Sequence, residues 1–489
     1  MKEPILHNIN DQALIKTASY INGKWHSSQA KFDVYNPATN EIITQLHDAN
    51  SDDATLAVQA AKKALKSWSS MPAHQRATLL RNWFNLMMEH QDDLARILTL
   101  EQGKPLAEAK GEIAYGAGFI EWFAEEGKRV YGDTIPSLSS NQKVIVVKQA
   151  VGVVASITPW NFPNAMITRK AAAALAAGCT FVVRPATQTP LSALAMAELA
   201  ERAGIPAGVF NVIIGEDAAG IGQVLTTHPD IAKFTFTGST AVGKILIKQC
   251  ASTVKKVSME LGGNAPFIVF NDADIDEAVK GAIISKYRNA GQTCVCTNRI
   301  FVQKDVLASF TEKFVAAVND LQVGNGIDAH NQIGPMISSA AVDGVAKLVN
   351  ESIAQGAVLA AGGERHHAGS HFFQPTILTN VTTDMPIASN EIFGPVSPII
   401  SFDNEDEAIK MANDTEYGLA AYFYARDIGR VWRVAEALEY GMVGINESII
   451  SNVAAPFGGV KQSGSGREGS KYGLDDYLEI KYLCMGGIA

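Results

Sequence analysis

Between about residues 151 and 303, short apolar runs alternate with longer stretches in which apolar residues recur every three or four positions. The long stretches AMITRKAAAALAA and LSALAMAELAER have helical periodicity and stop before Gly178 and Gly204. The short runs, rich in β-branched and aromatic residues as buried strands are, read VGVVASI, CTFVV, VFNVII, KFTFT, APFIVF and RIFVQ. This alternation predicts an α/β fold with doubly wound parallel sheets.

The predicted helices carry boundary signals of their own. Thr189 is expected to cap the helix that stops before Gly204, with Pro190 in its first turn. A further helix is expected over residues 272–291, with acids at its start and a basic residue near its end, which suits the helix dipole. It would place Arg288 about one and a half turns before Cys294.

Two segments lie outside the alternating pattern. Residues 129–149 have a turn-rich middle between two extended ends, which predicts a β-hairpin projecting from the body. The chain ends in YGLDDYLEIKYLCM, an apolar tail that suits docking on a neighbouring element or subunit, or an edge strand. At about 150 residues per domain, the length of 489 residues suggests about three domains.

Composition narrows the class of protein. The net charge is −9 and Lys/Arg-rich runs are absent, which argues against nucleic acid as a partner. The longest strongly apolar stretch, residues 171–183, is too short to span a bilayer, so no membrane segment is expected. The start of the chain lacks the apolar core of a signal peptide, and the five cysteines are too sparse for a secreted disulfide framework. A cytoplasmic location is expected.

Two of the five cysteines, Cys294 and Cys296, lie one residue apart in the segment NAGQTCVC. A cysteine is a strong nucleophile only as the thiolate, so it needs a nearby base or a favourable field. Taken alone, Cys294 could also be a small buried apolar residue. The Cys-x-Cys spacing does not fit a zinc site and no His run completes it, so no metal is predicted.

Three other segments offer polar groups for a reaction site. Glu260, in MELGG, is an acid in an apolar stretch; burial would raise its pKa towards that of a general base, although it could also bind backbone N–H groups. Asn161 lies in TPWNFP, a turn between prolines that could aim its amide at an oxyanion, or only stiffen packing. The segment FTGST around Ser239 predicts a helix start that faces a pyrophosphate, or an ordinary capped turn.

Taken together, TPWNFP, FTGST, MELGG, GQTC and EIFGP resemble, in this order and spacing, the NAD(P)-dependent aldehyde dehydrogenases over nearly the whole chain. NAGQTCVC, GREGSKYG and APFGGVKQSG are similar to the succinate-semialdehyde dehydrogenase branch. The resemblance implies two doubly wound parallel-sheet domains and a small β oligomerisation element, in a homodimer or homotetramer. The expected parts are a dinucleotide-binding domain (1–128 and 150–260), a catalytic domain (261–461), and an oligomerisation hairpin and tail (129–149 and 462–489).

The resemblance also implies roles for individual residues. Cys294 would attack the aldehyde, Asn161 would hold the oxyanion, and Glu260 would activate water to hydrolyse the thioester. The residues implied in cofactor binding are Thr158, Pro159, Trp160, Arg184, Ala186, Thr187, Gly238, Ser239, Gly243, Leu261, Glu391 and Phe393.

One departure from the family pattern bears on the cofactor. Where the family often has K-P-x-E, this chain has R-P-A-T, residues 184–187. A glutamate at the last position would repel a 2′-phosphate, whereas Thr187 is uncharged and Arg184 offers a planar cationic fork that suits phosphate. We therefore expect NADP as cofactor, with NAD as a weaker alternative; the simpler interpretation is that Arg184 only replaces a lysine.

The substrate follows from three further matches. Arg169, Arg288 and Ser451 correspond to residues that hold the far carboxylate of succinate semialdehyde in that branch, so the expected partner is a small acid semialdehyde. Arg288 could instead only complement the helix dipole. Glutarate semialdehyde is the alternative substrate, because one methylene contributes only about 1–3 kcal/mol to discrimination. A non-catalytic protein and a thiol esterase are the other functions considered.

Cys296 has two interpretations. It could be a core thiol beside the nucleophile, or a redox partner that forms a strained, easily reduced disulfide with Cys294.

Overall fold

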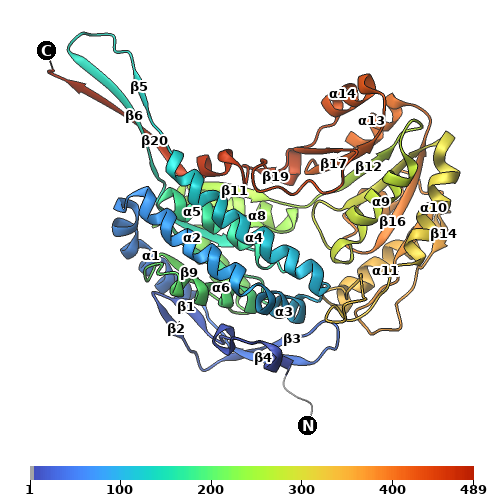
Figure 1. Ribbon diagram of the computed structural model, residues 1–489, viewed down its shortest axis with the longest axis horizontal. Helices are drawn as coiled ribbons and strands as arrows, with labels where there is room; N and C mark the ends of the chain where they lie inside the picture. Colours follow the sequence, from blue (N-terminus) through green and yellow to red (C-terminus); the bar gives the residue numbers. More distant parts are fainter. Residues whose placement is uncertain (1–4, 489) are drawn as a thin grey trace.

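The computed structural model describes residues 5–488, which form two lobes and a projecting arm (Figure 1). The first lobe contains an eight-stranded sheet with the order β19-β11-β10-β7-β8-β9-β1-β2. Its strands are β1 (Ser19–Ile21), β2 (Lys24–His26), β7 (Val153–Ile157), β8 (Thr180–Arg184), β9 (Phe210–Val212), β10 (Ile231–Thr237), β11 (Lys256–Glu260) and β19 (Gly464–Ser465).

The five central strands of this sheet, from β11 to β9, are parallel, as the alternating pattern predicted. Helices cover both faces, so the sheet is doubly wound. One face packs on α2 (Ala73–Glu89), α3 (Gln91–Gln102), α4 (Leu106–Glu126), α5 (Ala165–Ala177) and α6 (Leu191–Arg202). The other face packs on α1 (Ser51–Ser70), α7 (Ala218–Thr227) and α8 (Thr240–Cys250).

Register brings three strand ends together at one edge of the sheet. Thr237 at the end of β10 pairs with Glu260 at the end of β11, and Ile157 at the end of β7 pairs with Arg184 at the end of β8. In open α/β sheets, ligands bind outside the carboxyl ends of the strands. This edge therefore positions the site.

The second lobe is built on a seven-stranded sheet with the order β14-β15-β16-β13-β12-β17-β18. Its strands are β12 (Ala265–Val269), β13 (Thr297–Gln303), β14 (Val358–Ala361), β15 (Thr376–Thr379), β16 (Val396–Phe402), β17 (Ala420–Tyr424) and β18 (Met442–Ile445). Two apolar clusters pack its helices on the sheet; these helices are α9 (Ile275–Tyr287), α10 (Leu307–Asn319), α11 (Ser339–Ala354), α13 (Glu405–Asn413) and α14 (Ile428–Ala437).

The arm in Figure 1 confirms the predicted hairpin. It is a three-stranded antiparallel sheet in which β6 (Gln142–Ala150) lies between β5 (Asp133–Ile135) and β20 (Leu478–Gly486). The chain terminus thus forms an edge strand. Because β19 pairs with β11 in the large sheet, the part of the chain that belongs to the arm begins at Leu478, later than the expected boundary at residue 462.

The prediction of a Thr189 cap on α6 is wrong. The helix begins at Leu191, and the residue before it, Pro190, makes no side-chain capping bond. Instead the carboxylate of Glu101, at the end of α3, accepts hydrogen bonds from the backbone N–H groups of Leu191 (2.7 Å) and Ser192 (2.8 Å). A carboxylate at a helix N-terminus satisfies free donors and complements the dipole, whichever part of the chain supplies it.

The predicted helix over residues 272–291 is shorter than expected. Asp274 caps its start, and α9 ends at Tyr287. Asn289, Ala290 and Gly291 then adopt left-handed backbone angles, with φ of 53°, 54° and 75°. Arg288 is therefore separated from Cys294 by a tight reversal of the backbone and not by a helical turn, and such a run of left-handed residues is costly unless its surroundings fix it.

Candidate active site

A cavity of about 270 Å³ lies where the carboxyl edge of the large sheet meets the second lobe. Its lining includes the predicted nucleophile and oxyanion donor, Cys294 and Asn161, and these predicted cofactor residues: Pro159, Trp160, Gly238, Ser239, Leu261, Glu391 and Phe393. The structure adds Phe162, Met166, Thr237 and Gly262, which the motifs did not single out. The cavity therefore joins groups from four separate segments of the chain.

Cys294 follows the left-handed run and is partly exposed. Removal from bulk water raises the pKa of its thiol to about 12, an effect that the nearby Arg169 guanidinium opposes and the Glu391 carboxylate reinforces. At neutral pH the thiol is therefore protonated in this state. It needs a base, or the approach of further positive charge, to become the nucleophile.

Asn161 lies in the turn between β7 and α5 and is buried. Its Nδ2 donates to the carbonyl of Gln292 at 2.9 Å, which ties the turn to the Cys294 loop. An amide nitrogen carries two hydrogens, so one remains for a ligand. The carbonyl of Asn161 accepts two further hydrogen bonds, from Lys104 Nζ (2.8 Å) and Asn289 Nδ2 (3.0 Å), which the motifs did not predict.

Glu260 ends β11 and is 2 % exposed. Burial raises the pKa of its carboxyl well above the usual range, and the nearby Glu468 raises it further, against the opposing charges of Arg169 and Lys170. Its Oε2 has no hydrogen-bond partner among residues 5–488. A carboxyl group with a raised pKa and a free oxygen suits general-base work.

Glu468 belongs to a buried charge cluster that the sequence did not reveal. It forms ion pairs with both Arg169 and Lys170. These two cations lower the pKa of Glu468 against the opposite effect of its burial. The guanidinium of Arg169 also lies 4.0 Å from the centre of the Phe457 ring, and its Nη1 lacks a partner within the described part of the chain.

Arg288 and Ser451 are brought together, as predicted for a shared substrate contact. Both line a small cavity of about 10 Å³ on the other side of the nucleophile loop, together with Cys296. Tyr115, from α4, interacts with both predicted arginines and with Ser451, and all three lower the pKa of its phenol, while the larger effect of burial raises it. The structure thus adds a phenol to the predicted set.

Cys296 is buried, and its thiol donates to the carbonyl of Gly291 at 3.2 Å. Within residues 5–488, which include all five cysteines, every thiol is free. A disulfide between Cys294 and Cys296 stays a prediction.

Five predicted cofactor residues do not line the 270 Å³ cavity: Thr158, Arg184, Ala186, Thr187 and Gly243. At the end of β8, Arg184 Nη2 donates to Thr187 Oγ1 (3.0 Å) and to the carbonyl of Gly215 (2.9 Å). Gly243 faces Leu261 so closely that a Cβ on it would lie 2.4 Å from Leu261 Cδ2. Its evident role is to let α8 pack against the end of β11.

The cavity also passes a test for a bound nucleotide. The hydroxyl groups of Thr158 and Thr237 are buried at the sheet edge and lack hydrogen-bond partners in the described chain. Ser239 caps α8, whose first-turn N–H groups start at the cavity. Unpaired buried hydroxyls and a helix N-terminus are groups that a polar, anionic ligand satisfies.

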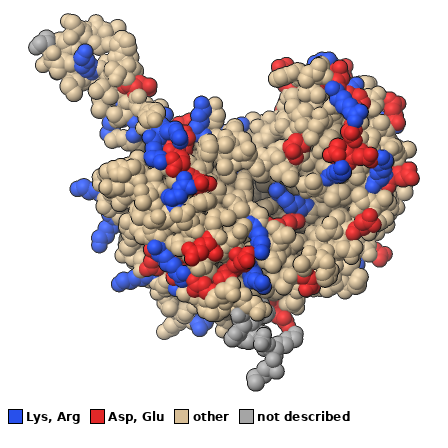
Figure 2. All heavy atoms as spheres, in the orientation of Figure 1, with Lys and Arg blue, Asp and Glu red and all other residues tan. Residues whose placement is uncertain are grey.

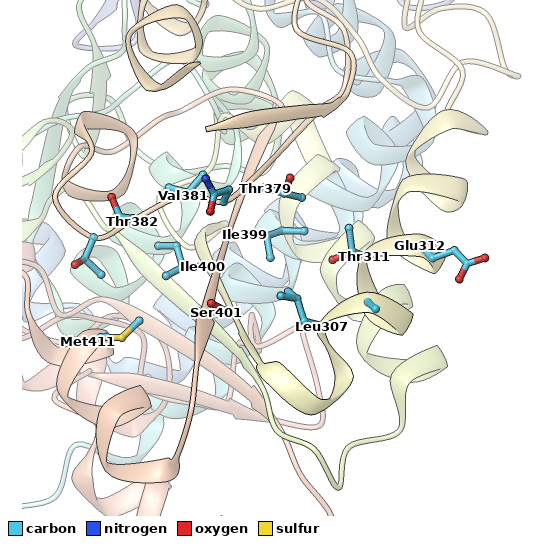
Figure 3. Close-up of a pocket in the computed structure, with 13 residues that line it drawn as sticks. Leu307, Thr311, Glu312, Thr379, Val381, Thr382, Ile399, Ile400, Ser401 and Met411 are labelled. Atoms are coloured by element: carbon cyan, nitrogen blue, oxygen red, sulfur yellow. The ribbon is translucent and has the colours of Figure 1, made fainter. Parts of the chain in front are cut away.

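A larger cavity, of about 740 Å³, lies elsewhere in the second lobe, between α10, β16 and the segment after β15 (Figure 3). Its lining is mostly Thr, Ile and other small or apolar residues, and the carboxylate of Glu312 points away from its centre. It lacks a nucleophile paired with a base, so the catalytic chemistry belongs to the smaller cavity.

Three further observations bear on partners. Acidic and basic side chains are interspersed on the face shown in Figure 2. Among the residues described, none of the helices combines the length and apolarity needed to cross a membrane. No group of three or more His, Cys, Asp or Glu side chains in the same part of the chain could hold a metal ion.

Comparison with known proteins decides the family, because residues 25–483 match the model of the aldehyde dehydrogenase family. The chain belongs to the aldehyde dehydrogenase family. A solved structure described as an NADP-dependent enzyme of Escherichia coli superposes with a TM-score of 0.97 at 58% identity, covering 98% of this chain and 100% of that one. The predicted family and α/β fold are thus confirmed.

Three curated relatives are similar over almost their full lengths. A 3-sulfolactaldehyde dehydrogenase of Pseudomonas putida is 59% identical, over 98% of this chain and 99% of the relative. The NADP(+) succinate-semialdehyde dehydrogenase GabD of Escherichia coli is 58% identical, with the same coverage. A glutarate-semialdehyde dehydrogenase of Pseudomonas aeruginosa is 57% identical, over 98% of this chain and 100% of the relative. Identity therefore does not separate the three substrates.

The raised pKa of Cys294 predicts how its thiol reacts in the absence of cofactor. Because only the thiolate is alkylated, the rate of iodoacetamide labelling at Cys294 should rise about tenfold per pH unit from about pH 7 to beyond about pH 10. Mass spectrometry of the labelled peptide measures this rate, and Cys294→Ser is the control for other thiols. A rate that levels off near about pH 8.5, as for an ordinary thiol, contradicts the assignment.

Proposed function

We propose that this aldehyde dehydrogenase oxidises small aldehydes that carry an anionic group at the far end, with succinate semialdehyde as the first candidate. The observation that carries the proposal is the group formed by Arg288, Ser451 and Tyr115, which lies beside the nucleophile loop and next to Arg169. Cationic and hydroxyl donors directed at one place suit a carboxylate or a sulfonate.

The residues of the chain divide the chemistry among them. The Cys294 thiolate attacks the aldehyde carbon and forms a thiohemiacetal. The free Nδ2 hydrogen of Asn161 and the N–H of Cys294 stabilise the negative oxygen, and one such donor contributes about 3 kcal/mol to catalysis. After oxidation to the thioester, Glu260 removes a proton from the water that releases the acid and Cys294.

Aldehyde dehydrogenases use NAD or NADP, which when bound accepts a hydride from the thiohemiacetal carbon. We infer that Trp160, Gly238 and Ser239 hold the pyrophosphate side and that Glu391 holds the nicotinamide ribose. Glu391 accepts a hydrogen bond from the N–H of Gly263 at 3.1 Å, and burial raises its pKa to about 7.

NADP is favoured over NAD by the residues at the end of β8. Thr187 brings no negative charge, and Arg184 brings a guanidinium. That guanidinium is engaged by Thr187 and the Gly215 carbonyl, and its Nε has no partner among the described residues. The name of the Escherichia coli relative, which includes NADP(+), agrees with this inference.

The relatives leave the length and charge type of the substrate open. Succinate semialdehyde, glutarate semialdehyde and 3-sulfolactaldehyde are all aldehydes with an acidic group at the other end. Glutarate semialdehyde is the second candidate, since a single methylene changes binding by only about 1–3 kcal/mol.

We also infer a homodimer or homotetramer. Ile480 and Tyr482 on the arm are 71% and 62% exposed, and Ile245 on α8 is 57% exposed. Large apolar side chains that are exposed together mark an interaction surface, and a second copy of the chain offers the same surfaces.

Arg288→Ala should weaken acidic substrates selectively. A charge-assisted hydrogen bond contributes about 1.5–3 kcal/mol, so the KM for succinate semialdehyde should rise roughly 10- to 100-fold, while the KM for a neutral aldehyde such as butanal changes little. Steady-state kinetics with both aldehydes measures the difference. Arg426→Ala, an exposed arginine paired with Asp274, is the matched control. Equal losses for acidic and neutral aldehydes refute an anion contact.

The cofactor inference predicts a higher kcat/KM with NADP than with NAD, by about tenfold or more, as one charge-assisted contact would give. In Thr187→Glu, repulsion between the new carboxylate and the 2′-phosphate should remove this preference, with little change for NAD. Rates of NADPH and NADH formation at limiting cofactor measure both values. A parent enzyme that strongly prefers NAD overturns the inference.

A further inference from the structure

A buried ion pair lies behind the turn that carries Asn161. Lys104, between α3 and α4, is 1% exposed, and its Nζ donates to Glu112 Oε2 on α4 at 2.6 Å. A buried charge is retained only when partners compensate for its lost hydration. The second partner of the Lys104 ammonium is the backbone carbonyl of Asn161, at 2.8 Å.

The same ammonium also contacts the next residue of the turn. Lys104 Nζ lies 3.7 Å from the centre of the Phe162 ring, a favourable distance for a cation and an aromatic face. Arg288 lies 5.3 Å from the centre of that ring. One lysine therefore holds the carbonyl of Asn161 and, through Phe162, contacts a ring shared with a predicted substrate arginine.

Glu112 fixes the other side of the turn. Its Oε1 accepts hydrogen bonds from the N–H groups of Asn164 (2.9 Å) and Ala165 (3.2 Å), where α5 begins. Lys104 and Glu112 thus hold the peptide on both sides of Phe162. With these two peptides fixed, the direction of the Asn161 side chain is set.

The nucleophile loop is attached to the same carbonyl. Asn289 donates from Nδ2 to the Asn161 carbonyl at 3.0 Å, and its Oδ1 accepts from Gln102 Nε2 at 2.9 Å. Asn289 is the first residue of the left-handed run before Cys294. The Asn161 carbonyl is therefore the point where the oxyanion turn, the nucleophile loop and the end of α3 meet.

We propose that Lys104 is a positioning residue for aldehyde oxidation: held by Glu112, its ammonium fixes the Asn161 backbone and so aims the Asn161 amide at the oxyanion. The inference rests on the proposed role of Asn161. Lys104 has no contact with the 270 Å³ cavity, so its effect on the reaction passes through the turn. Misplacement of a catalytic group by about 1 Å can cost on the order of 100-fold in rate.

The test removes the ion pair without leaving one charge buried. In Lys104→Met/Glu112→Gln, the glutamine oxygen can still accept from Asn164 and Ala165. The rate of NADPH formation in a single turnover should fall about 10- to 100-fold. Cofactor affinity should change less than about twofold, and a deuterated aldehyde should show a larger isotope effect. Lys110→Met, which breaks the exposed pair with Asp92 on the same helix, is the control and should keep the parent rate.

A double-mutant cycle separates positioning from general damage. If Lys104 acts through Asn161, the double substitution in an Asn161→Ala background should cost less than about twofold more. An equal loss in both backgrounds, or a folded double variant with the parent rate, overturns the proposal. If that variant does not fold, Lys104→Arg keeps the charge but not the ammonium geometry, and its smaller loss must likewise disappear in the Asn161→Ala background.

The outcome is distinguishable from failure of the proposed substrate. The cycle can be run with any aldehyde that the parent oxidises, acidic or neutral. A parent that oxidises only neutral aldehydes overturns the acid-semialdehyde proposal and leaves the Lys104 test intact. A parent that is active on acidic aldehydes, with additive losses in the cycle, overturns the role of Lys104 alone.

Discussion

The ionisable groups at the centre of this enzyme are held where water has little access, and their burial governs the site. It raises the pKa of Cys294 to about 12 and that of Glu391 to about 7, and it raises that of Glu260 well above its usual range. Each group is therefore biased towards its neutral form. A protonated thiol beside a carboxyl group of raised pKa is a pair in which proton transfer can create the nucleophile when substrate and cofactor arrive.

The charges that remain buried are paired, and the pairs also locate the loops. Glu468 holds Arg169 and Lys170 beneath Glu260, and Glu112 holds Lys104 beneath Asn161. Breaking a buried pair by removing one partner typically costs about 3–5 kcal/mol, so these pairs resist rearrangement. The carboxyl edge of the large sheet brings the strand ends together, and the ion pairs fix the side chains that extend from them.

Much of this arrangement is predictable from sequence where the signals are local. The strand and helix alternation predicted the doubly wound lobes, Gly178 marked the end of α5, and residues 129–149 predicted the hairpin of the arm. Family motifs placed Cys294, Asn161 and seven cofactor residues, which line one cavity. These predictions succeed because each depends on neighbours within one segment.

The contacts that local patterns missed join distant parts of the chain. Glu101 caps α6 from 90 residues away, and Lys170 pairs with Glu468 at a separation of 298 residues. The segment around Asn289 read as the end of a helix, yet buried hydrogen bonds from other loops hold it in a left-handed conformation. Long-range partners decide such positions, and periodicity carries no information about them.

The central claim is that Cys294 forms the acyl-enzyme and that Glu260 is needed to hydrolyse it. It is tested most directly by mixing Glu260→Gln with NADP and succinate semialdehyde, quenching, and mapping the protein by mass spectrometry. The account predicts a single burst of NADPH and one succinyl group on the peptide that contains Cys294, with neither in Cys294→Ser. An acyl group on Cys296 or elsewhere, or continued turnover without any adduct, would contradict it.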